Sequence, residues 1–125
     1  MKLPSGRKLA YPYPRIIGDD HEQHVVFADN AAGQFKDCRN GNGAYGGIWC
    51  ENVVSGIARD LLAAAMQRLE PKYPIVLHVH DEIVAEVPIG TGDVDEFTRL
   101  MTRKPAWALD LPIVASVWTD PRYRK

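Results

Sequence analysis

The sequence predicts an α+β fold in which an antiparallel sheet, built around a central hairpin, packs against two helices. Two patterns lead to this fold class. Residues 49–70 repeat apolar side chains every three or four positions, as one face of a helix does. Residues 75–88 instead alternate apolar and polar side chains in two short runs that meet at a polar corner, which is typical of a β-hairpin.

Composition limits the classes of protein that need to be considered. A chain of 125 residues has the size of one domain, so we expect a single domain over residues 1–125. Apolar residues make up 46% and charged residues 25%, which indicates a globular protein. No apolar run approaches the roughly 20 residues of a membrane span, and the first residues do not resemble a signal peptide. We therefore expect a cytoplasmic protein without a membrane partner, and the two cysteines do not suggest a disulfide framework.

The net charge of −1 conceals two basic ends. Residues 1–18 contain four basic side chains and no acidic one, whereas residues 101–125 contain five basic side chains and two acidic ones. An acidic centre between basic ends suits a site where metal ions and a polyanion meet. It also suits an ordinary solvated surface, and charge alone favours that interpretation.

Residues 1–48 predict short strands and a loop. A Pro-Ser-Gly turn comes first, and a short aromatic strand follows it. Because Pro12 and Pro14 cannot donate to a sheet, this strand either lies at an edge or ends there. Residues 24–28 predict a second strand, and residues 34–39 a third that pairs back on it. His21 and His24 lack the further ligands of a zinc site, so a loop is expected there. Glycine-rich residues 40–47 lack the lysine of a phosphate-binding loop and predict a connector.

Residues 49–70 predict a helix that Pro71 ends. Its expected apolar face consists of Val54, Ile57, Ala58, Leu61, Leu62, Ala65 and Leu69.

Residues 75–88 predict the hairpin. The period-two pattern places Ile75, Leu77 and Val79 on one face of the first strand, and Val76 and His78 on the other.

The corner of the hairpin carries His80, Asp81 and Glu82, where an ordinary turn would have Asn-Gly or Gly-Gly. Adjacent carboxylates repel each other and lose hydration when they are buried. A cation would relieve that conflict, so the corner predicts that Asp81 and Glu82 face a divalent metal and a phosphate.

Residues 93–125 predict a helix and a final strand. The helix runs from about Asp93 to Thr102, and Pro105 follows it. Residues 111–118 alternate as a strand does, and a basic, aromatic tail completes the chain. The inward face of the helix is expected to contain Val94, Phe97, Leu100 and Met101.

The hairpin sequence Val79-His-Asp-Glu-Ile-Val-Ala-Glu-Val-Pro88 resembles motif C of the family A DNA polymerases, the DNA polymerase I type. The likeness covers nearly the whole chain in order, and it is similar to the phage and prophage branch of that family. Matching segments include residues 3–7 (Leu-Pro-Ser-Gly-Arg), 45–47 (Tyr-Gly-Gly), 51–52 (Glu-Asn), 58–60 (Ala-Arg-Asp) and the Arg-Tyr-Arg-Lys ending. The resemblance implies the C-terminal portion of a polymerase palm.

The resemblance also implies an activity, which is nucleotidyl transfer from a dNTP to the 3′ end of a primer, with two Mg²⁺ ions. It implies that Asp81 is the principal metal ligand, that Glu82 is an accessory acidic residue, and that His80 contacts the primer end. In the family the helix before the hairpin lies along the minor groove of primer–template DNA. Three side chains of that helix therefore become DNA-contact candidates, namely Asn52, Ser55 and Arg59.

Two departures from the family pattern qualify this reading. Ser55 stands where the family has a longer glutamine, which puts one minor-groove contact in doubt. The second metal-binding aspartate (motif A) and the fingers helix, which lie upstream in the family, are not in this sequence. The resemblance therefore implies a fragment that is inactive alone and acts with a missing N-terminal polymerase portion. Apolar surface left where the fingers would pack is a reason to expect self-association.

Two other hypotheses remain open. A palm remnant that binds DNA or a partner without catalysis would have the same sequence features. Independently of the resemblance, a metal-dependent hydrolase could use His78, His80, Asp81 and Glu82.

Overall fold

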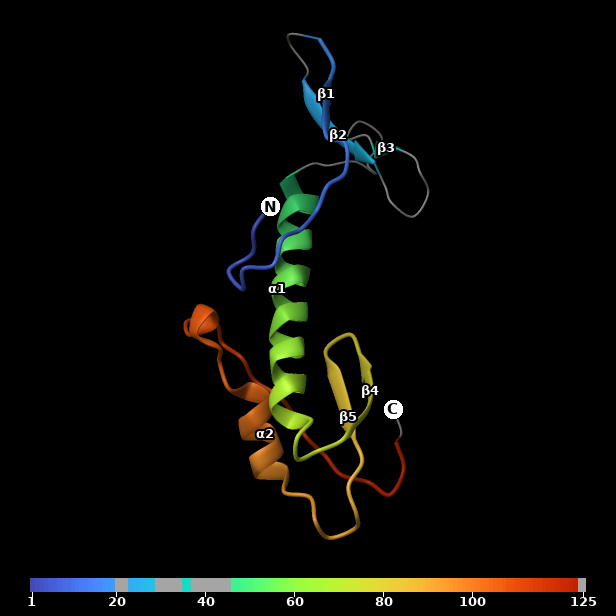
Figure 1. Ribbon diagram of the computed structural model, residues 1–125, viewed down its shortest axis with the longest axis vertical. Coiled ribbons are helices and arrows are strands. Elements are labelled where there is room, and N and C mark those ends of the chain that lie inside the picture. Colours follow the sequence, from blue (N-terminus) through green and yellow to red (C-terminus); the bar gives the residue numbers. More distant parts are fainter. Residues whose placement is uncertain (20–22, 29–34, 37–45, 124–125) are drawn as a thin grey trace. The chain divides into compact units, whose positions relative to one another are not determined.

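The computed structural model describes residues 1–19, 23–28, 35–36 and 46–123, and it has the predicted α+β class (Figure 1). The chain forms two compact units, Met1–Gly56 and Ile57–Lys125. The described strands belong to a three-stranded sheet and a separate two-stranded sheet. The hairpin forms the two-stranded sheet by itself, and the described N-terminal strands form the other sheet.

The N-terminal sheet contains β1 (Arg15–Ile17), β2 (His24–Ala28) and β3 (Phe35–Lys36), all antiparallel and in that order. The predicted strand at β2 and the pairing of β3 back on it are confirmed. β1 was not predicted. The aromatic strand expected before Pro12 is not formed. Tyr11 packs edge-on against two aromatic rings. The centroid of its ring lies 5.0 Å from that of Phe27 and 4.5 Å from that of Trp49.

The predicted turn near the N-terminus is confirmed. It docks at Gly56 of the long helix, a residue that belongs to the same unit. The Leu3 amide donates to the carbonyl of Arg7 at 2.8 Å, and Gly6 has a φ of +91° that glycine adopts without strain. Leu3 is buried against Gly56, where an added Cβ would lie 2.8 Å from Leu3 Cδ1. Arg7 Nη2 also donates to the Gly56 carbonyl at 2.9 Å. A residue without a side chain at position 56 lets the turn approach the helix backbone.

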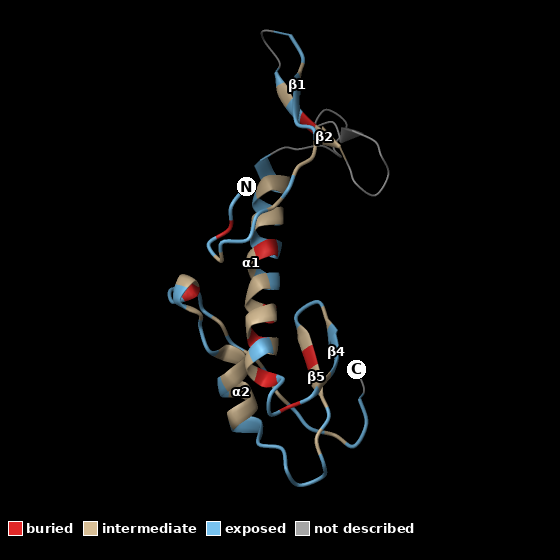
Figure 2. Ribbon diagram, in the orientation of Figure 1, coloured by how far each residue is buried: buried red, intermediate tan, exposed pale blue. Residues whose placement is uncertain are grey.

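Helix α1 (Gly46–Leu69) begins three residues before the predicted start and includes Gly46 and Gly47, which were expected to belong to the connector. The rest of the expected glycine-rich connector lies outside the described residues. The predicted apolar face is confirmed only in part. Leu62, Ala65 and Leu69 are buried, whereas Val54 and Ala58 are exposed (Figure 2). Within the described ranges, no helix combines the length and the apolar composition that crossing a bilayer requires.

The core of the Ile57–Lys125 unit lies where α1 meets the hairpin and the second helix. Strands β4 (Ile75–Val79) and β5 (Glu82–Ala85) lie on one side of the C-terminal half of α1, and α2 (Val94–Thr102) lies on the other (Figure 1). This arrangement confirms a hairpin packed against two helices. The buried cluster consists of Leu62, Ala65, Leu69, Tyr73 and Ile83.

Helix α2 begins as the sequence predicts. Asp93 is its N-cap, and one carboxylate oxygen accepts from the amide of Glu96 at 3.0 Å. Phe97, Leu100 and Met101 pack against the core as predicted. Val94 is exposed instead, because it is the first helical residue and lies at the solvent end of the face.

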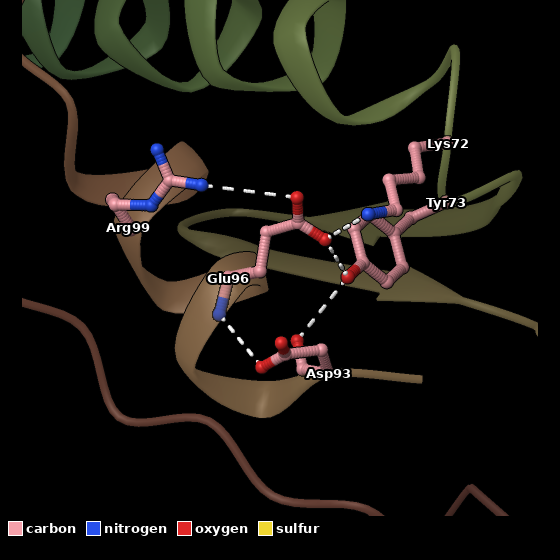
Figure 3. A network of polar contacts seen from close by, with 5 residues as sticks. All are labelled: Lys72, Tyr73, Asp93, Glu96 and Arg99. Carbon is pink, nitrogen blue, oxygen red and sulfur yellow. Dashed lines mark hydrogen bonds and ion pairs between the residues drawn. The ribbon is translucent and has the colours of Figure 1, made fainter. Parts of the chain in front are cut away.

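A polar network holds the start of α2 against the segment between α1 and β4 (Figure 3). The Tyr73 hydroxyl donates to Glu96 Oε2 at 2.7 Å, and Lys72 forms an ion pair with the same oxygen. These contacts lower the pKa of Glu96, the Lys72 hydrogen bond most strongly. A carboxyl whose pKa is lowered by folding stabilises the fold above its unfolded pKa, and that contribution disappears as the pH falls through the folded pKa. The network therefore stabilises this unit at neutral pH and weakens in acid.

The last part of the described chain is less regular than predicted. Residues 106–108 form a short 3₁₀ helix, η2 (Ala106–Ala108). Residues 111–118 were expected to be a final strand, but the structure assigns no strand there. Burial still alternates, since Ile113, Ala115 and Val117 are partly buried and the residues between them are exposed. The side-chain pattern of a strand is present, but a ladder also requires a neighbouring backbone with which to exchange hydrogen bonds.

Candidate functional site

The candidate site lies at the turn between β4 and β5. The last paired residues are Val79 and Glu82, so the turn consists of two residues, His80 and Asp81. Both turn residues are exposed, and Glu82 is partly buried as the first residue of β5. The predicted hairpin tip is therefore confirmed for His80 and Asp81, with Glu82 placed one position further along, inside the strand.

The turn contains a backbone conformation that is costly for histidine. His80 has a φ of +49°, in the left-handed region that glycine occupies easily and other residues avoid. A left-handed residue other than glycine costs about 1–2 kcal/mol. Strain of this kind is concentrated at functional sites, where a side chain is needed at a position that favours glycine.

We expect His80→Gly to raise the free energy of unfolding by up to about 1 kcal/mol, since glycine removes the strain but adds freedom to the unfolded chain. Urea denaturation followed by circular dichroism measures the change. The matched control is His78→Gly, which makes the same replacement at an exposed strand position without positive φ. The His78→Gly control should lower the free energy of unfolding by about 0.5–1 kcal/mol. A loss of stability in both variants would show that the φ of His80 carries no appreciable strain.

A β-bulge changes which face His78 occupies. Ile75 pairs with Ala85 and Leu77 with Val84, so Val76 is an extra residue on β4. His78 consequently lies opposite buried Ile83, and opposed residues of an antiparallel pair share a face. The prediction that Leu77 shares a face with Ile75 is wrong for this reason, and Leu77 is 42% exposed.

A tyrosine that the sequence reasoning did not select contacts the site. The Tyr123 hydroxyl donates to Glu82 Oε2 at 3.2 Å. Burial raises the pKa of Tyr123, and the charge of Glu82 and its hydrogen bond raise it further. The only signal in the sequence was an aromatic residue in a basic tail, and nothing about its position indicated a partner 41 residues earlier.

The three predicted DNA-contact residues of α1 differ in their surroundings. Asn52 is partly buried, and its amide nitrogen donates to the Tyr11 hydroxyl at 3.2 Å. Ser55 is exposed in the same unit. Arg59 is also exposed and belongs to the unit that contains the hairpin. His80 and Asp81 thus lie in the turn and Glu82 directly follows it in β5, whereas the three residues of α1 lie on a different element.

Among the described residues, the carboxylates at the hairpin tip do not belong to a closed metal centre. The described part of the chain contains no group of three or more His, Cys, Asp or Glu side chains placed to hold a metal. The hydrolase hypothesis required His78, His80, Asp81 and Glu82 to form such a group, and they do not. Adjacent carboxylates with open coordination positions suit Mg²⁺, which keeps several waters and takes ligands from phosphates.

One comparison with known proteins bears on this turn. The chain is 37% identical over 127 residues to a DNA polymerase of Bacillus phage SP02. This chain resembles part of a DNA polymerase. The likeness covers 100% of the chain but 19% of the phage polymerase, so the chain spans about a fifth of that relative's length. No family model matches the chain, and no solved structure matches it.

Proposed function

We propose that the chain is the C-terminal palm portion of a phage-encoded, intracellular family A DNA polymerase, and that it acts in template-directed DNA synthesis within a larger polymerase. One observation supports this proposal above the others. A chain similar throughout its length to a segment of a phage DNA polymerase has a His-Asp-Glu sequence that resembles motif C, with His80 and Asp81 in a two-residue turn and Glu82 directly after it. Primer–template DNA, a dNTP and the N-terminal polymerase portion are the proposed partners.

Asp81 is proposed as the principal ligand of the catalytic Mg²⁺, with Glu82 as an accessory carboxylate. The exposed position of Asp81 suits this role, because its oxygens are open to a substrate that arrives from solvent. Mg²⁺, when bound, lowers the pKa of the primer 3′-hydroxyl and offsets charge on the departing pyrophosphate. Two paired strands hold the carboxylates, and a rigid support of this kind keeps them in place while the DNA moves.

His80 and Arg59 are proposed to contact DNA. His80 is exposed beside Asp81 in the turn, so its imidazole is available to the primer end. Arg59 is exposed on α1, and its guanidinium suits a phosphate or a base edge in the minor groove. Ser55 and Asn52 complete the proposed contact set. Asn52 already donates to Tyr11, so a DNA contact through its amide nitrogen would compete with that hydrogen bond.

A primer-extension assay tests the proposal. With Mg²⁺, dNTPs and a primer–template, the 125-residue chain alone should give no extension, because motif A and the fingers are absent from it. The complete polymerase, meaning this chain joined to its N-terminal polymerase portion, should extend the same primer. Denaturing gel electrophoresis of a labelled primer resolves the products.

The outcomes separate the hypotheses. Extension by the chain alone would contradict an incomplete catalytic set. Primer–template binding by the chain alone, with no extension after it is joined to the N-terminal portion, would favour the non-catalytic palm remnant.

A further inference from the structure

The tail of the described chain reaches back to the candidate site. The Tyr123 hydroxyl donates to Glu82 Oε2 at 3.2 Å, and both residues belong to the Ile57–Lys125 unit. Just before the tyrosine, the Arg122 amide donates to Asp120 Oδ1 at 3.1 Å, a local turn that fixes the direction of the tail. The tail therefore presents a neutral hydroxyl donor to the carboxylate of Glu82, directly after the turn.

This contact restrains a side chain that has considerable freedom. A glutamate has three rotatable side-chain bonds, and ordering it when a ligand binds costs conformational entropy. Glu82 is only partly buried, so packing alone does not select one rotamer. A hydrogen bond to a carboxylate is stronger than one between neutral groups, and it involves one oxygen of Glu82. Oε2 is the oxygen that accepts this hydrogen bond, and Oε1 is the second oxygen of the same carboxylate.

We propose that Tyr123 is a positioning residue, whose hydroxyl holds the Glu82 carboxylate in the orientation that assists metal binding at the turn. The inference rests on the proposed polymerase function. Tyr123 acts through Glu82 and touches neither DNA nor the reacting atoms. The opposing view is that the contact only anchors the tail, in which case its loss would change stability without changing the affinity for metal.

The test is Tyr123→Phe in the complete polymerase, which removes the hydroxyl and keeps the ring. We expect the Mg²⁺ concentration that gives half-maximal primer extension to rise about threefold to tenfold, as expected for the loss of one hydrogen bond. The maximal rate at saturating Mg²⁺ should change less than twofold. The affinity for Mn²⁺ alone, measured by electron paramagnetic resonance, should fall by a similar factor. The matched control is Tyr13→Phe, since Tyr13 is 74% exposed and lies in the other unit.

A double-mutant cycle with Glu82→Gln separates positioning from a structural role. If the hydroxyl acts through Glu82, adding Tyr123→Phe to Glu82→Gln should leave the Mn²⁺ affinity unchanged. Unchanged Mn²⁺ affinity in the single variant would overturn the proposal, as would an equal effect in both backgrounds. A lower melting temperature without any change in Mn²⁺ affinity would identify a tail anchor instead. The polymerase function itself is tested by primer extension with an Asp81→Asn variant of the complete polymerase, so failure of that function and failure of the positioning role are distinguishable.

Discussion

We expect Asp81→Asn to lower the rate of primer extension by the complete polymerase at least about a thousandfold, with DNA affinity largely retained. The change removes the negative charge that the proposed Mg²⁺ requires and keeps the size of the side chain, and the loss of such electrostatic stabilisation has effects of this order. Single-turnover extension measures the rate, and fluorescence anisotropy with a labelled primer–template measures the affinity.

The matched control for this variant is Asp110→Asn. Asp110 is exposed and lies after η2, outside the hairpin, so the same replacement should leave the extension rate within about twofold of the unmodified value. Synthesis retained in Asp81→Asn would refute the metal role of the turn. Equal losses in both variants would point to a general effect of charge.

The largest change in stability is expected for Leu69→Ala. Leu69 is the last residue of α1 and is completely buried, where it packs with Tyr73 and Ile83 in the core cluster. Removing three carbons from a buried leucine leaves a cavity, and such changes cost about 2–5 kcal/mol. Urea denaturation of the chain, followed by circular dichroism, should show the midpoint falling accordingly.

Leu109→Ala is the control for this core variant. Leu109 is 63% exposed, so the same truncation there should change the free energy of unfolding by less than about 0.5 kcal/mol. Similar losses at the two positions would mean that the cluster around Leu69 is not the core of this unit.

The elements defined by local pattern could be predicted from the sequence. The helical repeat located α1 to within three residues at its start, and the capping aspartate located the start of α2. The alternation before and after the polar corner located the hairpin. These predictions succeeded because the signals come from neighbouring residues and persist over several turns or strand positions.

Features that depend on distant partners could not be predicted. The alternation over residues 111–118 is present, but strand formation requires a partner that the pattern does not specify. The contact of Tyr123 with Glu82 joins residues 41 positions apart and has no periodic signal. In the candidate site, sequence could place His80 and Asp81 at the tip, but it could not reveal the positive φ of His80.

The extra residue Val76 divides strand β4 into two segments, and the register with β5 shifts by one residue between them. Between Val76 and the turn, the pairing of Val79 with Glu82 is fixed by the two-residue turn. On the other side of Val76, Ile75 pairs with Ala85, and both residues pack against the core. Deleting Val76 would remove the bulge and join the two segments in an unbroken ladder, with Ile75 still opposite Ala85 and Leu77 still opposite Val84, and the turn would not change. A one-residue change in length at Val76 therefore leaves the pairing next to His80 and Asp81 in register. Such variation at the turn itself would move Asp81.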